Sequence, residues 1–505
     1  MALNTNGISF SGLATGMDTS ALIQQLVALE SQPILQMQAK QQSFQSKLSA
    51  VGTLKGLVAD LQTQAGILSK NSSFLSFLST VSLEGHVAAS ASGSASAGTH
   101  TVTVNQLATI DRWTFDPVAD RTTDLATADG QHIAFSVGAT AYDVVLTAAD
   151  SSLEDIAAAI NSVAGADVAA TVVNIGTTAA PSYQLVMTSK QSGEANRISG
   201  ITQDVAGLAI DATGPTLGGV AQSANNITVG MNAIAVIDGL TVTRETNEFN
   251  DVITGLSLTL QAADPLLEVS VSVAADTGAI KNKIKDFVAS FNKLVDFVNT
   301  QNTYTKDLGP GGVLFGDPIL RQVLAQVRDA LFNVDPGVVT ADTQGYSTLS
   351  LIGIKTESNG KLKIDDALLT DKLAENLDEL ANLFVDSDGF DNGGALENTP
   401  AFYQDTTLDA GLADKLSRSI DRLLDSYTGP GGRVFKGTFD ARTQSYNESI
   451  SKLLKDIDAK QVQVDRFQDQ LIQRFANLEQ LMSGLQAQGA SLSAALASLN
   501  PRSQS

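Results

Sequence analysis

The chain has 505 residues, 43% of them hydrophobic, and its 54 Asp and Glu outnumber its 32 Lys and Arg to give a formal net charge of −22. That length provides for several domains, and the excess of acid repels phosphate backbones and anionic membranes, so no nucleic-acid partner is expected. Cysteine is absent, which excludes disulfide bonds, thiolate catalysis and cysteine metal ligands.

The first residues and the hydropathy bear on export. Residues 1–10 lack the positively charged segment and the apolar segment of a secretory signal. No apolar run approaches the ~20 residues that a membrane helix needs, so we expect no membrane insertion. These features fit a cytosolic protein, and they equally fit export by a route that reads no cleavable signal.

The N-terminal region is predicted to be helical. Apolar residues recur at threes and fours up to Leu68, and Pro33 marks a kink or a break between two helices. Many of the remaining positions are Gln. We assign residues 1–70 to an N-terminal helical stalk segment, and residues 71–85 to the first piece of a discontinuous helical base domain.

The middle of the chain is predicted to be rich in β-strands. A run of Ala, Ser and Gly at 88–98 reads as a connector or an edge strand, and alternating apolar segments follow as far as 275. Residues 86–110 and 231–274 are expected to form one discontinuous β-rich domain. Residues 111–230 are expected to form an outer β-rich domain with a short helix that begins after Ser151 or Ser152.

The middle region is also strongly acidic, with 19 Asp and Glu against five basic residues between Val87 and Ala275.

Helices return after Thr277, where a broad apolar stripe from Ile280 to Val298 predicts a helix on a core. Asp317 followed by a proline predicts a capped helix start. Residues 275–446 are therefore assigned to the rest of the helical base domain.

The C-terminal segment, residues 447–505, is predicted to be a coiled-coil helix. Its apolar positions alternate by fours and threes, a period of 3.5 residues, whereas a helix on a globular core usually carries a wider stripe. Gln461 and Gln468 occupy seam positions and would weaken its middle. The apolar residues of this predicted seam are Ile450, Leu454, Ile457, Val464, Leu471, Phe475, Leu478, Met482, Leu485, Leu492, Leu496 and Leu499.

The natural partner for this seam is the helical segment at the other end of the chain, so the two ends are expected to meet. The predicted fold class is α+β and multidomain. Terminal coiled-coil helices form a stalk on a helical base domain, and β-rich head domains are inserted into that base.

Candidate catalytic and metal-binding groups are few. His86, His100 and His132 lie in the β-rich region and read as ordinary surface histidines. Residues 386–397 begin like a calcium loop, but Phe390 stands at a ligand position and Asp391 replaces the required turn glycine. No nucleophile elbow or phosphate-binding loop is present. The sequence therefore predicts no enzyme activity, no cofactor and no metal site.

The N-terminal segment from residue 8 to residue 33 closely resembles the signature of the flagellar hook-associated protein 2 family, whose members cap the flagellar filament. The residues of this N-terminal family motif are Gly12, Gly16, Met17, Asp18, Leu22, Leu26 and Pro33. Further segments that resemble the family lie at 232–256, 351–365, 383–384 and 474–482, and 135–160 resembles a module shared with flagellin. The least similar part is 105–230.

The resemblance implies an extracellular protein at the tip of a bacterial flagellum, exported without a cleaved signal peptide. It implies a ring of about five subunits that retains exported flagellin, promotes its folding and guides it into the filament. Hook–filament junction proteins and a dedicated export chaperone are the further partners that it implies. Some members of the family also bind host mucin, which these residues neither support nor exclude.

Two alternatives remain at this point. One is an extracellular adhesin on a coiled-coil stalk, which the acidic composition and the terminal helices would also fit. The other is a different flagellar axial protein such as flagellin, which is not expected to carry the block Gly16-Met17-Asp18.

Overall fold

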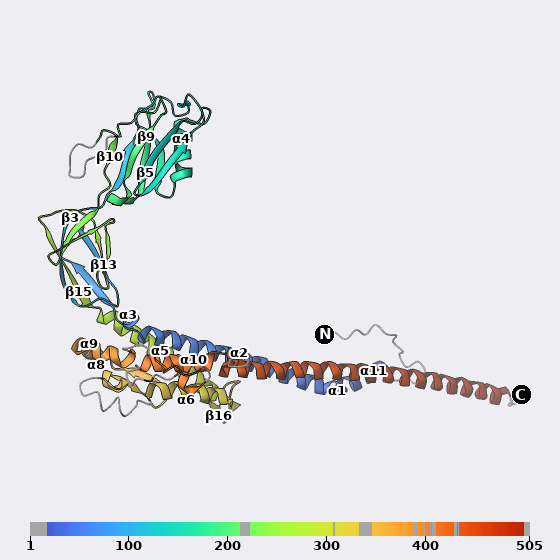
Figure 1. The fold of residues 1–505 in the computed structure, drawn as a ribbon. Coiled ribbons are helices and arrows are strands. Elements are labelled where there is room, and N and C mark those ends of the chain that lie inside the picture. The colour runs from blue at the N-terminus through green and yellow to red at the C-terminus, as the bar shows by residue number, and fades with distance from the viewer. Residues whose placement is uncertain are drawn as a thin grey trace. The chain divides into compact units, whose positions relative to one another are not determined.

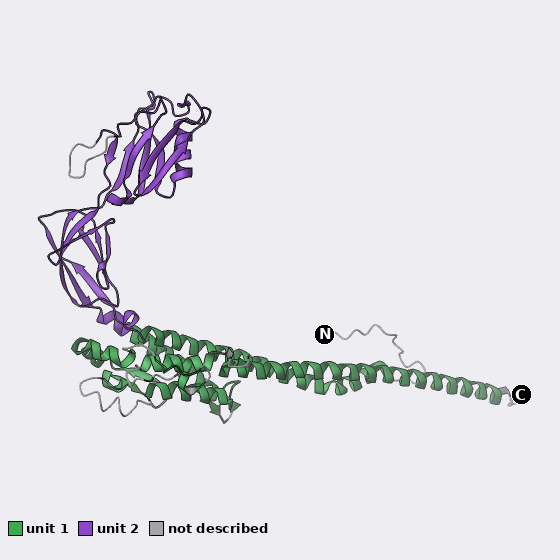
Figure 2. Cartoon of the chain, in the orientation of Figure 1, with its two compact units in different colours: residues 1–69, 283–505 green, residues 70–282 purple. Residues whose placement is uncertain are grey.

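The computed structural model describes residues 18–212, 223–306, 309–332, 346–386, 391–396, 399–403, 411–428 and 434–498, together with positions 406 and 432. The chain divides into two compact units, residues 1–69 with 283–505 and residues 70–282 (Figure 2). The first unit is mainly helical and the second mainly β, which confirms the predicted α+β multidomain class.

The helical unit is formed by both ends of the chain. Its helices are α1 (Thr19–Glu30), α2 (Gln32–Leu68), α5 (Thr277–Asn302), α6 (Pro318–Phe332), α8 (Asp366–Glu375), α9 (Leu377–Phe384), α10 (Leu412–Leu424) and α11 (Thr438–Ser498). Short 3₁₀ turns occupy Leu349–Ile352 and Pro400–Tyr403. Three small hairpins join the helices: β16 (Tyr304–Thr305) with β17 (Gly309–Pro310), β18 (Ile354–Thr356) with β19 (Leu362–Ile364), and β20 (Tyr427–Thr428) with β21 (Val434–Phe435).

The core of the helical unit follows from two apolar stripes. The stripe predicted on α5 is buried, with Phe287, Phe291 and Leu294 fully enclosed. The second half of α2 carries a stripe from Val51 to Leu68 that is also buried, and α2 packs against α10 and α11. Pro33 lies in the first turn of α2 and α1 ends at Glu30, so the predicted break between two helices is present.

The β unit contains two hydrophobic cores, one from residues 87–108 and 233–273 and the other from residues 113–208. The first β part holds a five-stranded sheet in the order β1-β15-β3-β11-β12 and a three-stranded sheet in the order β13-β14-β2. The strands are β1 (Phe77–Val81), β2 (Val87–Ala91), β3 (Gly98–Gln106), β11 (Ala233–Ile237), β12 (Leu240–Arg244), β13 (Glu248–Ile253), β14 (Leu256–Leu260) and β15 (Glu268–Ala275), preceded by the short helix α3 (Asn71–Phe74).

Strand β1 differs from the sequence-based assignment. Residues 71–85 are predicted to belong to the helical base, whereas β1 pairs antiparallel with β15 from Phe77↔Ala275 to Val81↔Val271. The alternation of half-buried and exposed residues along β1 explains this pairing, because it is the pattern of a strand rather than a helix. The boundary between the two units accordingly falls at residue 69.

The second β part covers residues 110–228. Its sheets are ordered β10-β4-β8-β7 and β6-β5-β9. The strands are β4 (Ile110–Thr114), β5 (His132–Val137), β6 (Thr140–Val145), β7 (Val168–Asn174), β8 (Tyr183–Ser192), β9 (Ile198–Gln203) and β10 (Asn226–Thr228), with helix α4 (Leu153–Ala164) and a 3₁₀ turn at Glu194–Asn196.

The predicted short helix corresponds to α4, which follows β5 and β6 and precedes β7 and β8 along the chain. Ser152 caps α4 in a capping box with Asp155, so one of the two predicted caps is used. The buried face of α4, with Leu153, Ile156 and Ile160, joins the core of this part, and α4 packs on β7. Figure 1 shows α4 against the strands of this part.

Candidate assembly interface

The two ends of the chain pack together along α11, as the sequence predicts. Val464 and Leu471 of α11 are buried against Val27 of α1 and Ile34 of α2. Ile457 and Phe475, among others, pack at the edge of this cluster. Figure 1 shows α1 lying beside the middle of α11, with the C-terminal end of α11 continuing past it.

The two segments run antiparallel. Lys460 Nζ lies 2.5 Å from Glu30 Oε1, and Lys55 Nζ lies 2.9 Å from Asp440 Oδ1. Residue numbers therefore rise along α1 and α2 while they fall along α11. Asp18 caps the N-terminus of α1 by accepting a hydrogen bond from Ala21 N at 2.9 Å.

The second row of the seam lies in a different place from the prediction at its start, and in the predicted place near its end, where Gln468 and Phe475 are half-buried. Leu454 is exposed and so is Gln461, while Leu453, Lys460 and Phe467 are half-buried. The shifted row starts at the buried Tyr446, and its next members follow at intervals of seven residues. Each of them lies three residues after a member of the first row. Lys460 takes a seam position because its aliphatic stem can lie over apolar neighbours while its ammonium group reaches Glu30.

Burial along α11 ends near Phe475. Val464 is 2% exposed, whereas Leu478 is 43% exposed and Leu485 is 53% exposed. Leu492 and Leu496 are exposed as well, and Met482 is half-buried. Leu499 lies outside the described residues, as do Gly12, Gly16 and Met17 of the N-terminal motif. Of the described motif residues, Leu26 joins the cluster, Leu22 is exposed, and Pro33 is exposed.

A buried polar cluster fixes the start of α11. Arg442 Nη2 donates to Asp317 Oδ2 at 2.5 Å, and the Tyr446 hydroxyl donates to the same oxygen. Asp317 Oδ1 accepts from Ile319 N at 3.1 Å and thereby caps α6. The ring of Tyr446 also lies 5.8 Å from the ring of Phe44 in α2. This root cluster, residues 44, 317, 442 and 446, joins three helices at one point.

Ionisation in the root cluster follows from burial and hydrogen bonding. Burial alone would raise the pKa of Asp317, but the hydrogen bonds from Arg442 and Tyr446 outweigh it, so the pKa lies below its ordinary value. Burial, and then the hydrogen bond to Asp317, raise the pKa of Tyr446 to about 12. The sequence predicts Asp317 only as a helix cap, although Arg442 and Tyr446 lie four residues apart on one face of α11.

The histidines lie on separate elements. His100 Nδ1 in β3 is 2.7 Å from Asp238 Oδ2, His132 in β5 contacts Asp143, and His86 precedes β2. Within the described ranges, no group of three or more His, Asp or Glu side chains is placed to hold a metal ion. Residues 387–390 and 397 of the acidic loop lie outside those ranges. None of the described helices is long and apolar enough to cross a membrane.

Comparison with known proteins places this geometry in a family. Residues 230–487 match the model of the flagellar hook-associated protein 2 C-terminus, and residues 15–111 match that of its N-terminus. The chain belongs to the flagellar hook-associated protein 2 family. The matches include the N-terminal helices, most of α11 and the first β part, while 112–229 lie outside both, in agreement with the least similar region expected from the sequence.

Relatives extend over almost the whole chain. Flagellar hook-associated protein 2 of Escherichia coli K12 is 29% identical over 487 residues, which cover 93% of this chain and 98% of that protein. The A-type protein of Pseudomonas aeruginosa is 28% identical and covers 98% of each chain. The crystal structure of the E. coli flagellar cap protein FliD, domains D1-D2-D3, has a TM-score of 0.60 and 25% identity over 79% of this chain and 99% of that chain.

Proposed function

We propose that this chain is a flagellar filament cap protein, a homo-oligomer at the distal tip that retains exported flagellin and promotes its folding and insertion into the filament. The observation that carries the proposal is membership of the family, with matches at both ends of the chain and relatives that cover more than nine-tenths of it. The chemistry is that of assembly between surfaces rather than of catalysis.

The exposed end of α11, residues 476–498, is the surface that we assign to assembly. Its row of leucines continues the buried row of Val464 and Leu471 without a change of spacing. Covering one leucine contributes about 1.5–3 kcal/mol, so several together give a large driving force. A helix with a matching apolar row, supplied by a neighbouring subunit of the assembly, is the occupant that this row fits.

The finer features of the proposal rest on the resemblance of the N-terminal motif. They are a ring of about five subunits, export through the flagellar channel without a cleaved signal, a dedicated export chaperone, and contact with the hook–filament junction proteins. The division into a stalk segment, a helical base and two β-rich domains is part of the same proposal. The two separate hydrophobic cores of the β unit support its last element.

Complementation tests the proposal. The full chain, returned to its own bacterium after deletion of the gene, should restore swimming and keep flagellin out of the medium. A chain that stops at residue 475 should remain folded, because it keeps the buried cluster, but should not restore swimming. Light scattering of the purified full chain should give the mass of a small closed oligomer. Swimming with the shortened chain would contradict the role of the exposed row.

A further inference from the structure

The chain passes twice between the first and second β parts, and these crossings are paired with each other. Thr109 N donates to Met231 O at 3.0 Å, and Met231 N donates to Thr109 O at 3.3 Å. On one side β3 pairs with β11, and on the other β4 pairs with β10. Antiparallel pairing therefore continues from one part into the other, whereas connections between domains are usually exposed and flexible.

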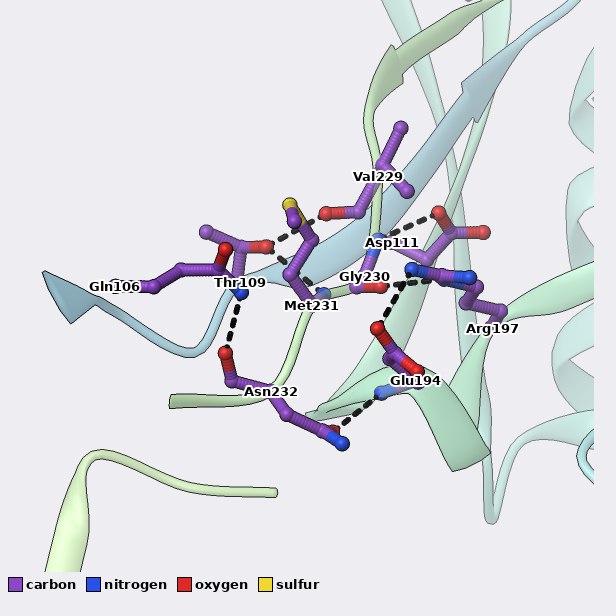
Figure 3. Close-up of polar contacts among 9 residues, drawn as sticks. All are labelled: Gln106, Thr109, Asp111, Glu194, Arg197, Val229, Gly230, Met231 and Asn232. Carbon is purple, nitrogen blue, oxygen red and sulfur yellow. Dashed lines mark hydrogen bonds and ion pairs between the residues drawn. The ribbon is translucent and has the colours of Figure 1, made fainter. Parts of the chain in front are cut away.

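Side chains tighten the same crossings, as Figure 3 shows. The Thr109 hydroxyl donates to Val229 O at 2.6 Å and accepts from Met231 N at 3.0 Å. Asp111, only 2% exposed, accepts from Gly230 N at 2.9 Å. We call residues 106–111 and 229–232 the joint.

Asp111 also connects the joint to the core of the second β part. It accepts from Ile198 N at 2.9 Å and from Trp113 Nε1 at 2.7 Å. A buried carboxylate is costly unless donors satisfy its oxygens. Loss of the contact to Gly230 would therefore leave a buried charge without one of its donors, which resists separation of the two crossings.

The first β part holds the joint through an asparagine. Ala108 N donates to Asn247 Oδ1 at 2.7 Å, and Asn247 Nδ2 donates to Ala108 O at 3.0 Å. The amide thus satisfies both backbone groups of Ala108, as a neighbouring strand would.

A turn of the second part rests on the first part beside the joint. Glu194 N donates to Asn232 Oδ1 at 2.8 Å, and the Ser192 hydroxyl donates to Glu245 O at 2.6 Å. Gly193 between them has φ +99°, and a Cβ there would meet the Glu245 side chain at 2.8 Å. Only glycine allows this approach.

We propose that the joint is a conformational device that holds the two β parts in one fixed orientation, with Asn247 and Asp111 as its positioning residues. A change of orientation must break the Thr109–Met231 pair, the Asn247 pair and the contacts of the 192–194 turn together. Each such hydrogen bond has a favourable net free energy, and their simultaneous loss makes any other orientation of the two β parts rare. This inference does not depend on the filament cap function.

Distance measurement between spin labels on the full chain tests the proposal. Because the sequence contains no cysteine, Val173→Cys in β7 and Leu240→Cys in β12 introduce two label sites, both exposed and on different β parts. Pulsed electron double resonance should give one narrow distance distribution when the labelled chain is diluted with an excess of unlabelled chain, so that only distances within one subunit are measured. Asn247→Ala should broaden or split that distribution, because it frees Ala108 from the first part.

The matched control is Asn161→Ala. Asn161 makes the same amide pair with Ala170 inside the second part, with both bonds at 2.8 Å, so its loss should lower the melting temperature without broadening the distribution. Thr109→Val keeps the shape of the side chain and is the second test variant if Asn247→Ala does not fold. A broad distribution in the unsubstituted labelled chain would overturn the proposal. So would an Asn161→Ala effect equal to that of Asn247→Ala, or a narrow distribution in every folded joint variant.

Discussion

The two stretches of α11, residues 438–475 and 476–498, carry the same kind of apolar row but lie in different surroundings. In the first stretch Val464 and Leu471 are buried by α1 and α2, whereas Leu478 and Leu485, seven and fourteen residues further, are about half exposed. One sequence pattern therefore has two roles in α11, packing within the chain in the first stretch and an exposed apolar row in the second. A seam shows which faces of a helix can pair, and the available partner decides whether the pairing stabilises the folded chain or an assembly.

The two stretches also differ in what fixes them. Arg442, Asp440 and Lys460 make ion pairs to other helices in the first stretch. The second stretch contains Gly484 and Gly489, each of which lowers helix stability by about 1 kcal/mol relative to Ala. The end of α11 is thus built with less intrinsic helix stability, so an added partner helix has more to contribute there.

Val464→Asp should have the largest effect on the folded chain. It places a carboxylate in the buried cluster of α1, α2 and α11, where an uncompensated charge costs several kcal/mol. We expect a clear loss of the packing between α1 and α11, measured as faster hydrogen exchange in residues 19–37, together with loss of swimming. Arg466→Ala, on an exposed position two residues away, is the control and should change neither.

Asp317→Asn should have the next largest effect, and it tests the root cluster through pH. The folded-state pKa of Asp317 is lowered, so its contribution is present above the unfolded value of about 3.9 and is lost as pH falls through the folded value. The free energy of unfolding of the variant should be lower by about 1.5–3 kcal/mol at neutral pH. Measured by urea unfolding, it should also fall less steeply than that of the unsubstituted chain as pH is lowered; we call this fall the acid limb. An acid limb identical to that of the unsubstituted chain would contradict the assignment.

Tyr446→Phe separates the alkaline side of the same cluster. The pKa of Tyr446 is raised to about 12, so its contribution is complete below the ordinary value of about 10 and is lost as pH rises through 12. The variant should lack this alkaline component, and it should keep only the part of the acid dependence of Asp317 that Arg442 and the Ile319 backbone supply, because Tyr446 also donates to that carboxylate. Urea midpoints between pH 8 and pH 11, on the parent and the variant, provide the comparison.

Glu30→Gln should have the smallest effect. The pair with Lys460 is partly exposed, and such pairs contribute about 0.2–1 kcal/mol and weaken with salt. We expect a small decrease of the melting temperature at low salt that disappears at high salt. A large, salt-independent decrease would mean that Lys460 holds the seam by its charge rather than by its stem.

The sequence predicts much of this fold because periodicity and caps are local signals. The α5 stripe, the Ser152 cap, the break at Pro33 and the meeting of the chain ends all depend on spacings within one element. The position of the second seam row, at Leu453 rather than Leu454, does not. It depends on which face of α11 meets α1 and α2, and that face is fixed at Tyr446 by contacts with α6 and α2.

Contacts between distant segments cannot be predicted from sequence patterns either, because a local pattern does not identify the distant partner. Strand β1 finds its place only through β15, nearly two hundred residues later. Asn247 and Asp111 look like ordinary turn and strand residues, and their partners Ala108 and Gly230 carry no side-chain signal for hydrogen bonding. A single sequence shows which side chains can satisfy a backbone group, but the fold decides which group that is.

Leu485→Asp, with Ala487→Asp as its control, tests whether the exposed leucine row of α11 serves assembly rather than stability of the folded chain. Both changes add one carboxylate to the exposed stretch of α11, the first on the leucine row and the second about 160° around the helix from it. Melting temperature and swimming should be measured on the same two variants. We expect an unchanged melting temperature for both, with swimming lost and flagellin released only in Leu485→Asp. Equal swimming in the two variants, or unfolding of the free chain by Leu485→Asp, would contradict it.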